Sequence, residues 1–324
     1  MRRQVMVHPG LLLLLVIVLA AMAGCQKKWP FLEDRYSKIP ADITKGTPEN
    51  DSFPPVLHSN EWEDPVPMPG PVNTAGGEDS PYITADGTEF YFFFTPDVRV
   101  PVELQVLDSV TGIWCSRLEA GAWTDPERVI LSSDLSMDGC EVVLGDTIWF
   151  ASVRGGNYGE IDWYTAVRRE DEWADWLNMG EEINVERKPG EFHITSDHRT
   201  MYFGKPGRYG KNDLWKMERT AAGWDEPENL GPVVNGPMDE TRPHVSSDMK
   251  ELWFTGWSDS FAGPAVYLSR LDSLGQWGKP VPIVEQFAGE PTVDDAGNLY
   301  FIHHYYTTTG RMIEADVYVC RRKK

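Results

Sequence analysis

Cysteine is scarce in this chain and follows no metal-binding or redox pattern. Of the four cysteines, Cys25 lies near the N-terminus, and Cys115, Cys140 and Cys320 are far apart. There is no Cys-x-x-Cys pair, which argues against a zinc ribbon or a thioredoxin-type redox site. The three later cysteines leave at least one thiol unpaired, and the sequence does not choose which two would form a disulfide.

Clusters of basic residues and common nucleophile motifs are also lacking. Thirty Lys and Arg stand against fifty Asp and Glu, which gives a net charge of −20. This argues against a nucleic-acid partner, because contacts to phosphates need a basic surface. No Gly-x-Ser-x-Gly motif is present, which argues against an esterase of the α/β-hydrolase type.

Long apolar runs are confined to the N-terminus. Arg2 and Arg3 precede an apolar stretch at residues 11–21, and Met22-Ala23-Gly24-Cys25 follows. This layout is typical of a secretory signal, and the stretch is too short to span a bilayer comfortably. We therefore predict a signal peptide over residues 1–24.

The end of this signal resembles a bacterial lipobox, with Met22 where Leu is usual. The resemblance implies cleavage before Cys25 and lipidation of Cys25; an ordinary signal peptide with a chance cysteine is the alternative. Gln26 follows where an inner-membrane retention signal would place Asp. The resemblance thus implies a lipid-anchored protein of the cell envelope, at the outer membrane.

Residues 25–58 and 59–324 differ in character. The first segment has little apolar periodicity and carries five prolines, so we predict a flexible tether there. The second segment holds most of the 38 aromatic residues, which are 13 Trp, 13 Phe and 12 Tyr. It is long enough for one large all-β domain.

Residues 59–324 contain a motif that recurs five times. Each copy is a short strand, a polar turn and a second apolar strand, as in Pro81-Tyr82-Ile83 running into Phe90-Tyr91-Phe92. The residues chosen to mark the five copies are Tyr82, Glu141, His193, His244 and Thr292. They lie roughly 50 residues apart, a period that fits four short strands, which is one blade of a β-propeller.

A second motif predicts how the array closes. Segments such as Trp224-Asp225-Glu226-Pro227 end the middle repeats, but the last repeat stops at Cys320 without one. The missing piece, Trp62-Glu63-Asp64-Pro65, stands before the first repeat. We therefore predict an all-β, five-bladed propeller closed by its N-terminal strand, which removes the open sheet edges.

The repeat resembles the TolB-like, WD-like β-propeller repeats of exported bacterial proteins. The likeness rests on the Pro-x-Ile/Val-Ser/Thr-x-Asp-Gly strand and turn and on the aromatic strand after it, from about Asn60 to the end. Cys140 and Phe192 depart from the Pro of the motif. Propellers include enzymes, ligand binders and scaffolds, so the resemblance implies a fold and no activity.

Strand alternation predicts which side chains face the central channel. The middle layer is Tyr82, Glu141, His193, His244 and Thr292, and the layer before it is Ser80, Gly139, Glu191, Arg242 and Glu290. Glu141, His193 and His244 would form a divalent-metal site, since two His and a carboxylate leave positions open for water. Polar channel residues bonded to one another are the alternative; Tyr82 and Thr292 would contact a ligand.

The layer that contains Glu191, Arg242 and Glu290 offers weaker candidates for catalysis. Glu191 and Glu290 flank Arg242, so they could act as acid and base or form a salt bridge with the arginine, and we favour the salt bridge. The oligogalacturonate lyases, which resemble this repeat, hold a metal by channel-facing His residues. His303 and His304 are expected in a surface loop, and Trp257, Tyr305 and Tyr306 as ordinary aromatics.

We favour a binding or scaffolding function at the cell envelope, for a protein, peptide or glycan partner. The alternative is an enzyme that acts on saccharides in the channel, as a metal-assisted lyase or in the manner of a glycoside hydrolase. No cofactor is assigned beyond the possible divalent metal.

Overall fold

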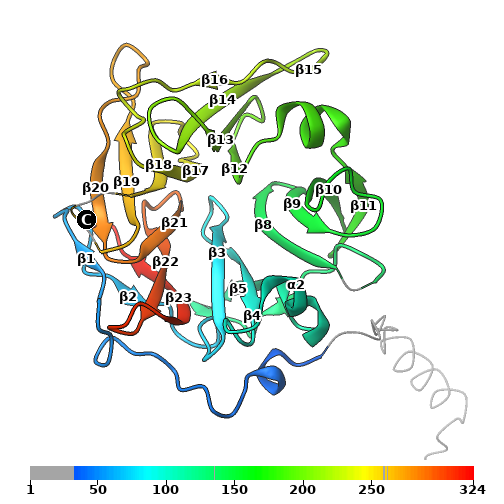
Figure 1. Cartoon of the computed structure of the whole chain (residues 1–324), viewed down its shortest axis with the longest axis vertical. Helices are drawn as coiled ribbons and strands as arrows, with labels where there is room; N and C mark the ends of the chain where they lie inside the picture. Colours follow the sequence, from blue (N-terminus) through cyan, green and yellow to red (C-terminus); the bar gives the residue numbers. More distant parts are fainter. Residues whose placement is uncertain (1–32, 135, 258–259, 261) are drawn as a thin grey trace, which may run out of the picture. The chain divides into compact units, whose positions relative to one another are not determined.

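The computed structural model describes residues 33–134, 136–257, 260 and 262–324. Residues 33–324 form one compact unit whose regular secondary structure is mostly antiparallel strands (Figure 1). The predicted signal peptide and Cys25 lie outside the described residues. Among the residues described, no helix has the length and apolar character needed to cross a bilayer.

The strands form antiparallel meanders, each from a run of consecutive strands. The first is β3 (Gly77–Ile83), β4 (Glu89–Thr95), β5 (Gly112–Glu119), β6 (Ala122–Trp123) and β7 (Glu127–Arg128). The second is β8 (Met137–Leu144), β9 (Thr147–Val153), β10 (Asp162–Arg169) and β11 (Glu172–Asn178). The third is β12 (Phe192–Ile194), β13 (Thr200–Pro206), β14 (Asn212–Thr220), β15 (Gly223–Trp224) and β16 (Glu228–Asn229).

Two further meanders follow. One is β17 (Glu240–Val245), β18 (Glu251–Gly256), β19 (Ala265–Arg270), β20 (Val281–Glu285) and the outermost β1 (Val56–Leu57). The other is β21 (Ala288–Val293), β22 (Leu299–Tyr306), β23 (Met312–Cys320) and β2 (Val66–Pro67). The helical pieces are short: η1 (Arg35–Lys38), α2 (Val102–Gln105), η2 (Val106–Asp108) and η3 (Glu182–Arg187).

The innermost strands of the meanders are β3, β8, β12, β17 and β21. Each contacts the next in that order, and β21 contacts β3. Figure 1 shows them around a common centre, with β11 and β20 at the periphery. A single parallel bridge between Gly77 and Ala315 joins the first and last meanders, so the five meanders count as four hydrogen-bonded sheets. None of these four sheets closes on itself in the part of the chain that the structure describes. The predicted blade count and closure therefore stay predictions.

The N-terminal strand lies where the sequence places it. β2 pairs with β23, with Val66 opposite Val319 and Pro67 opposite Tyr318. Trp62 forms a bridge with Arg322, and its buried indole packs edge-on against Trp253 at 5.4 Å between ring centroids. The predicted pairing of the segment near Trp62 with the last strand is confirmed.

The core lies between neighbouring meanders, so the second strand of each is buried on both faces. On β4, Phe90, Tyr91 and Phe92 are all buried, which explains why this strand reads as a continuous apolar run rather than as an alternating one. Cys115 and Cys320 are buried within this packing, and all three described cysteines are free thiols.

Residues 33–58, which we call the strap, are part of the compact unit. A flexible tether was expected there, and for this segment that expectation is wrong. In Figure 1 the strap runs in blue past β23 to β1, which pairs with β20. Contacts made by Arg35, Lys45 and Asp51 hold the strap on the domain. These are single polar residues far apart in the strap, so they leave no periodic apolar pattern in the sequence.

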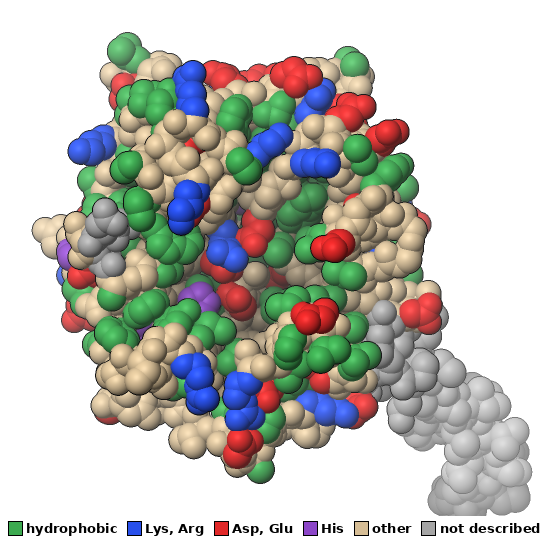
Figure 2. Space-filling view, in the orientation of Figure 1, with side chains coloured by type: hydrophobic (Ala, Val, Ile, Leu, Met, Phe, Trp, Pro, Cys, Tyr) green, Lys and Arg blue, Asp and Glu red, His purple; other side chains and the backbone are tan. Residues whose placement is uncertain are grey.

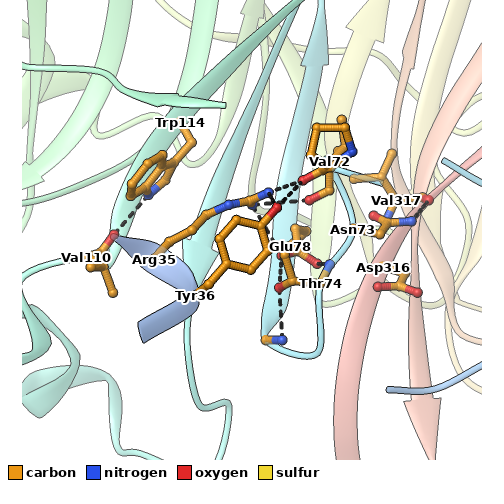
Figure 3. Close-up of polar contacts among 12 residues, drawn as sticks. Arg35, Tyr36, Val72, Asn73, Thr74, Glu78, Val110, Trp114, Asp316 and Val317 are labelled. Atoms are coloured by element: carbon orange, nitrogen blue, oxygen red, sulfur yellow. Dashed lines mark hydrogen bonds and ion pairs between the residues drawn. The ribbon is translucent and has the colours of Figure 1, made fainter. Parts of the chain in front are cut away.

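Arg35 is the first of these anchors (Figure 3). Only 2% of it is exposed, its guanidinium lies 3.5 Å from Glu78, and it donates to the carbonyl of Val72 at 3.1 Å. The cation also lies over the rings of Phe94 and Trp114. Burial raises the pKa of Glu78 to about 7, and the charge of Arg35 opposes that rise.

Removing this charge should make the folded state sensitive to alkali. A carboxyl whose pKa is raised by folding adds stability below its unfolded pKa, and that stability is lost as the pH rises through the folded pKa. In Arg35→Met the pKa of Glu78 should rise above 7. In urea denaturation, the free energy of unfolding of Arg35→Met should be lower than that of the wild type by on the order of 3 kcal/mol at pH 9. From pH 6 upward it should also fall more steeply with pH than that of the wild type.

The double variant Arg35→Met with Glu78→Gln is the control, because an amide cannot ionise. Between pH 6 and pH 9, its free energy of unfolding should fall with pH no more steeply than that of the wild type. An equally steep decline in the double variant would contradict the assignment of this pH dependence to Glu78.

Candidate functional site

A bulge shapes four of the five innermost strands. In each of β3, β8, β17 and β21, a pair of consecutive residues is left out of the pairing with the second strand of the meander. The first residue of each pair has a left-handed φ; these residues are Ser80 (46°), Cys140 (56°), Arg242 (50°) and Glu290 (53°). Such a bulge re-aims side chains and is common next to active sites.

The bulges correct the predicted layers in one meander. Val142 pairs with Trp149, as His244 pairs with Trp253 on β17, so Val142 stands at the position of the histidines. Glu141 takes the position that Pro243 has on β17. The prediction that Glu141 shares a layer with His193 and His244 is wrong by one residue, and a slip of one residue in a strand moves a side chain to the other face.

A belt of side-chain-to-backbone hydrogen bonds surrounds the centre. His244 Nε2 accepts from the Val293 N–H, and Thr292 Oγ1 accepts from the Ile83 N–H, each at 3.3 Å. The side chains of Tyr82 and His193 interact with the backbones of Val143 and Val245 in the same order around the ring. Each of these four residues thus contacts the next innermost strand, and Val142 interrupts the belt because it has no polar side-chain atom.

The two histidines of the belt are neutral. Their ring centroids are 4.3 Å apart and both are buried. Burial lowers the pKa of His193 to about 3 and holds the pKa of His244 well below its usual range. Tyr82 and Thr292, predicted to contact a ligand, are buried in the same belt.

Glu141 is buried beside this belt without a partner. Neither carboxylate oxygen has a hydrogen bond, and burial raises the pKa of the group well above its usual range. Glu141, His193 and His244 line one cavity of about 60 Å³, room for a few waters. Among the described residues no group of three or more His, Cys, Asp or Glu is arranged to hold a metal ion, so metal binding here stays a prediction.

Arg242 sits between two carboxylates at the open end of this cavity. Its Nε lies 2.5 Å from Glu191 and 2.9 Å from Glu290. Neither contact follows the N–H direction, so both are ion pairs rather than hydrogen bonds. The salt-bridge interpretation favoured from the sequence describes this arrangement.

Three larger cavities meet at Arg242, and we call their common opening the mouth. The polar arm, 420 Å³, includes Lys188, Glu191, Lys205, Asp239, Arg242 and Trp257 in its lining. The aromatic arm, 350 Å³, includes Arg242, Trp257, Phe287, Glu290, His304 and Tyr306. The apolar arm, 210 Å³, includes Asp79, Phe93, Met137, Val153, Ile161 and Arg242. Figure 2 shows this face hollowed at its centre, with acidic, basic and histidine side chains on the floor.

Several residues of the mouth were missed from the sequence. Asp79 directly precedes the bulge of β3, and its carboxylate lies 4.0 Å from His304 Nε2. The surface loop expected for His303 and His304 is wrong, because both lie on β22 and His303 is fully buried. Tyr306 and Trp257 do line the mouth, whereas Tyr305 is buried against Tyr318.

Glu290 has the most perturbed carboxyl group of the mouth. It is 7% exposed, and burial raises its pKa well above the usual range, opposed by Arg242 and reinforced by Asp79 and Glu191. Burial thus favours the protonated form of Glu290, which can donate a proton or a hydrogen bond, while the charge of Arg242 favours the ionised form. Glu191, in contrast, is 34% exposed.

The comparisons with known proteins give no family. No family model matches the chain, and no curated protein matches it. Among solved structures, TolB from Acinetobacter baumannii aligns with 12% identity and a TM-score of 0.46, over 78% of this chain and 56% of TolB. This chain thus spans just over half the length of that TolB.

Two glycosidases align at similar levels. An alpha-L-arabinofuranosidase from Lactobacillus brevis has 14% identity and a TM-score of 0.46, over 78% of this chain and 92% of its own. A GH43_1 enzyme from Xanthomonas citri has 10% identity and a TM-score of 0.47, over 78% and 89%. At these scores neither likeness supports an argument about function.

The orphaned carboxyl of Glu141 gives a direct prediction. Because folding raises its pKa, the wild type should lose stability as the pH rises, and Glu141→Gln should remove that loss. In urea denaturation at pH 8, we expect the free energy of unfolding of Glu141→Gln to exceed that of the wild type by about 1 kcal/mol. At pH 5 the difference should be smaller.

Metal analysis of the same variant tests the metal prediction. If Glu141, His193 and His244 hold a divalent ion, wild-type protein incubated with Zn²⁺ and then desalted should retain about one ion per chain. Glu141→Gln should retain much less. Equal retention by both proteins would contradict a role for Glu141 as a ligand.

Proposed function

We propose that this chain is a lipid-anchored protein of the cell envelope whose five-bladed propeller binds a glycan at the mouth around Arg242. The observation that carries the proposal is the convergence of three cavities on one arginine held between Glu191 and Glu290. Two of these cavities fall within the usual size of small-molecule sites, about 300–1,000 Å³. The inner cavity of about 60 Å³ is too small for a sugar ring.

The ring of five blades is supported by the contacts of the innermost strands. β3, β8, β12, β17 and β21 touch in order and return to the start, and β2 completes the last meander. Propellers carry their ligand sites on a face, where the loops and strand ends of several blades meet. The mouth draws on strand ends of every meander.

Backbone strain at the mouth favours a functional site over a purely structural one. Besides the four bulge residues, Lys188 and Phe287 have left-handed φ angles of 46° and 56°, and both line an arm. Such conformations cost about 1–3 kcal/mol each and gather at ligand sites. Six of the thirteen described non-glycine residues with left-handed φ angles thus line this one hollow.

The chemistry of the arms favours a glycan. Trp257, Phe287 and Tyr306 offer flat apolar faces to the C–H side of a sugar ring. Arg242, Glu191 and Asp239 offer donors and acceptors for hydroxyl groups at fixed places. A ligand that needs both flat apolar contact and many hydrogen bonds fits this lining.

The proposed lipid anchor would hold the domain near the bilayer. Seven residues separate Cys25 from Glu33, where the compact unit begins. Even fully extended, they span only about 25 Å. Lipidation of Cys25 and the outer-membrane destination rest on the lipobox resemblance and on Gln26.

Trp257 lines both the polar and the aromatic arms, so it is the sharpest test of glycan binding. On an array of bacterial and plant polysaccharides, Trp257→Ala should lose at least ten-fold in affinity for the glycan that the wild type binds, because a large buried contact disappears. Leu274→Ala is the control, since Leu274 is exposed and lines none of the three arms. Wild-type protein that binds no glycan would contradict the proposal.

A saccharide-cleaving enzyme is the second candidate, and the state of Glu290 favours it. The contacting oxygens of Glu191 and Glu290 are 2.5 Å and 2.9 Å from one nitrogen, so they lie within about 5.4 Å of each other. Retaining glycosidases space their carboxyl groups by about 5–5.5 Å, a spacing near the upper limit that these two contacts permit. Glu290 would donate the proton and Glu191 would act as the nucleophile, once a substrate displaces Arg242 from between them.

This candidate makes a prediction about pH. Cleavage that needs protonated Glu290 should fall off as the pH rises through the pKa of Glu290, which burial places above the usual range of a carboxyl group. Glu290→Gln should lower kcat at least 1,000-fold with little change in glycan affinity. Release of reducing sugar from the bound polysaccharide measures both, and an undiminished rate in Glu290→Gln would contradict the enzyme.

A further inference from the structure

One wall of the aromatic arm is held in an unusual backbone conformation. Gln286 and Phe287 both have left-handed φ angles, 70° and 56°, where β21 is about to begin. A bulky residue rarely adopts this conformation, and it persists only where the surroundings hold it. What holds Phe287 therefore decides the shape of the arm.

Three groups pack around the Phe287 ring. Tyr306 stacks on it with ring centroids 4.3 Å apart, and Gly263 leaves it room, since a Cβ there would come within 2.4 Å of the ring. Both line the aromatic arm. The third is Phe53, whose ring meets Phe287 edge-on at 5.3 Å. Phe53 belongs to the strap and is not part of the cavity lining.

The strap is pinned on both sides of Phe53. Two residues before it, Asp51 contacts His303 Nε2 at 2.7 Å, and both side chains are nearly inaccessible. Three residues after it, β1 begins its pairing with β20. His303 in turn precedes His304, which lines the aromatic arm.

The strap is also held farther back along the chain. Lys45 Nζ pairs with Glu314 and Asp316 on β23, and the Gly46 N–H donates to Glu314 at 2.6 Å. Without Lys45 these two carboxylates would share a buried site with no cation beside them. The position of Phe53 is thus fixed by polar contacts that a sliding or frayed segment could not make.

We propose that the strap braces the mouth: Phe53 is a positioning residue that keeps Phe287, and with it the aromatic arm, in its ligand-binding shape. This rests on the proposed function of the mouth. It couples the segment next to the anchor to the ligand site, so that release of the strap would loosen the arm and lower its affinity, and a bound ligand would tighten the strap by the same factor.

Hydrogen exchange tests the brace without any ligand. In the full mature chain, Phe53→Ala should raise amide exchange at least ten-fold in peptides covering residues 286–306, while β8 and β12 keep wild-type rates. Asp42→Ala is the matched control, because Asp42 is an exposed strap residue that pairs only with Arg99 at the surface among the contacts described. The control should leave residues 286–306 unchanged.

An exchange rate at residues 286–306 within two-fold of the wild type in Phe53→Ala would overturn the proposal. If Phe53→Ala raises exchange in every strand, the milder variant Phe53→Leu is measured in its place. In Phe53→Leu, faster exchange confined to residues 286–306 supports the brace, and uniformly faster exchange overturns it. Affinity for an array-identified glycan should fall at least five-fold in Phe53→Ala. If no glycan binds, the proposed function fails while the exchange result still decides the brace.

Discussion

The mouth depends on the bulge in the middle of four of the five innermost strands. A regular strand would continue the ladder through Arg242 and Glu290, whereas the bulge places each in a left-handed conformation outside the pairing. The extra residue lets one short strand supply both a mouth residue and a belt residue, as β17 does with Arg242 and His244. The cavities, the ion pairs and the perturbed carboxyl of Glu290 all follow from where these bulges aim their side chains.

Burial separates the centre of the molecule into a neutral layer and a charged layer. In the belt, desolvation lowers the pKa of His193 and His244 and so favours their neutral forms, and beside it burial raises the pKa of Glu141. At the mouth, Arg242 keeps its charge because Glu191 and Glu290 are beside it. A ligand that enters the mouth therefore meets charge and hydrogen-bonding groups first, above a floor that offers only neutral polar groups.

The strap makes the N-terminal segment part of the same architecture. It uses single polar anchors in place of a continuous strand: Arg35 at Glu78, Lys45 at Glu314 and Asp316, and Asp51 at His303. Each anchor neutralises or binds a buried group that would otherwise be costly, so the body of the domain and the strap stabilise one another. This arrangement links residues 35–58 to the mouth through one connected chain of contacts.

The sequence by itself determined the all-β class, the repeated strand units and the pairing of the segment near Trp62 with the last strand. It also brought Glu191, Arg242 and Glu290 together, because strand alternation and a repeat of about 50 residues are local properties of the chain. Only the tertiary structure decided the rest. The register of β8 places Val142, and not Glu141, level with His244, and the second repeat has Glu141 where β3, β17 and β21 have the proline that marks this register. The strap and the three arms depend on contacts between residues hundreds of positions apart, such as Asp51 with His303, which no local pattern records.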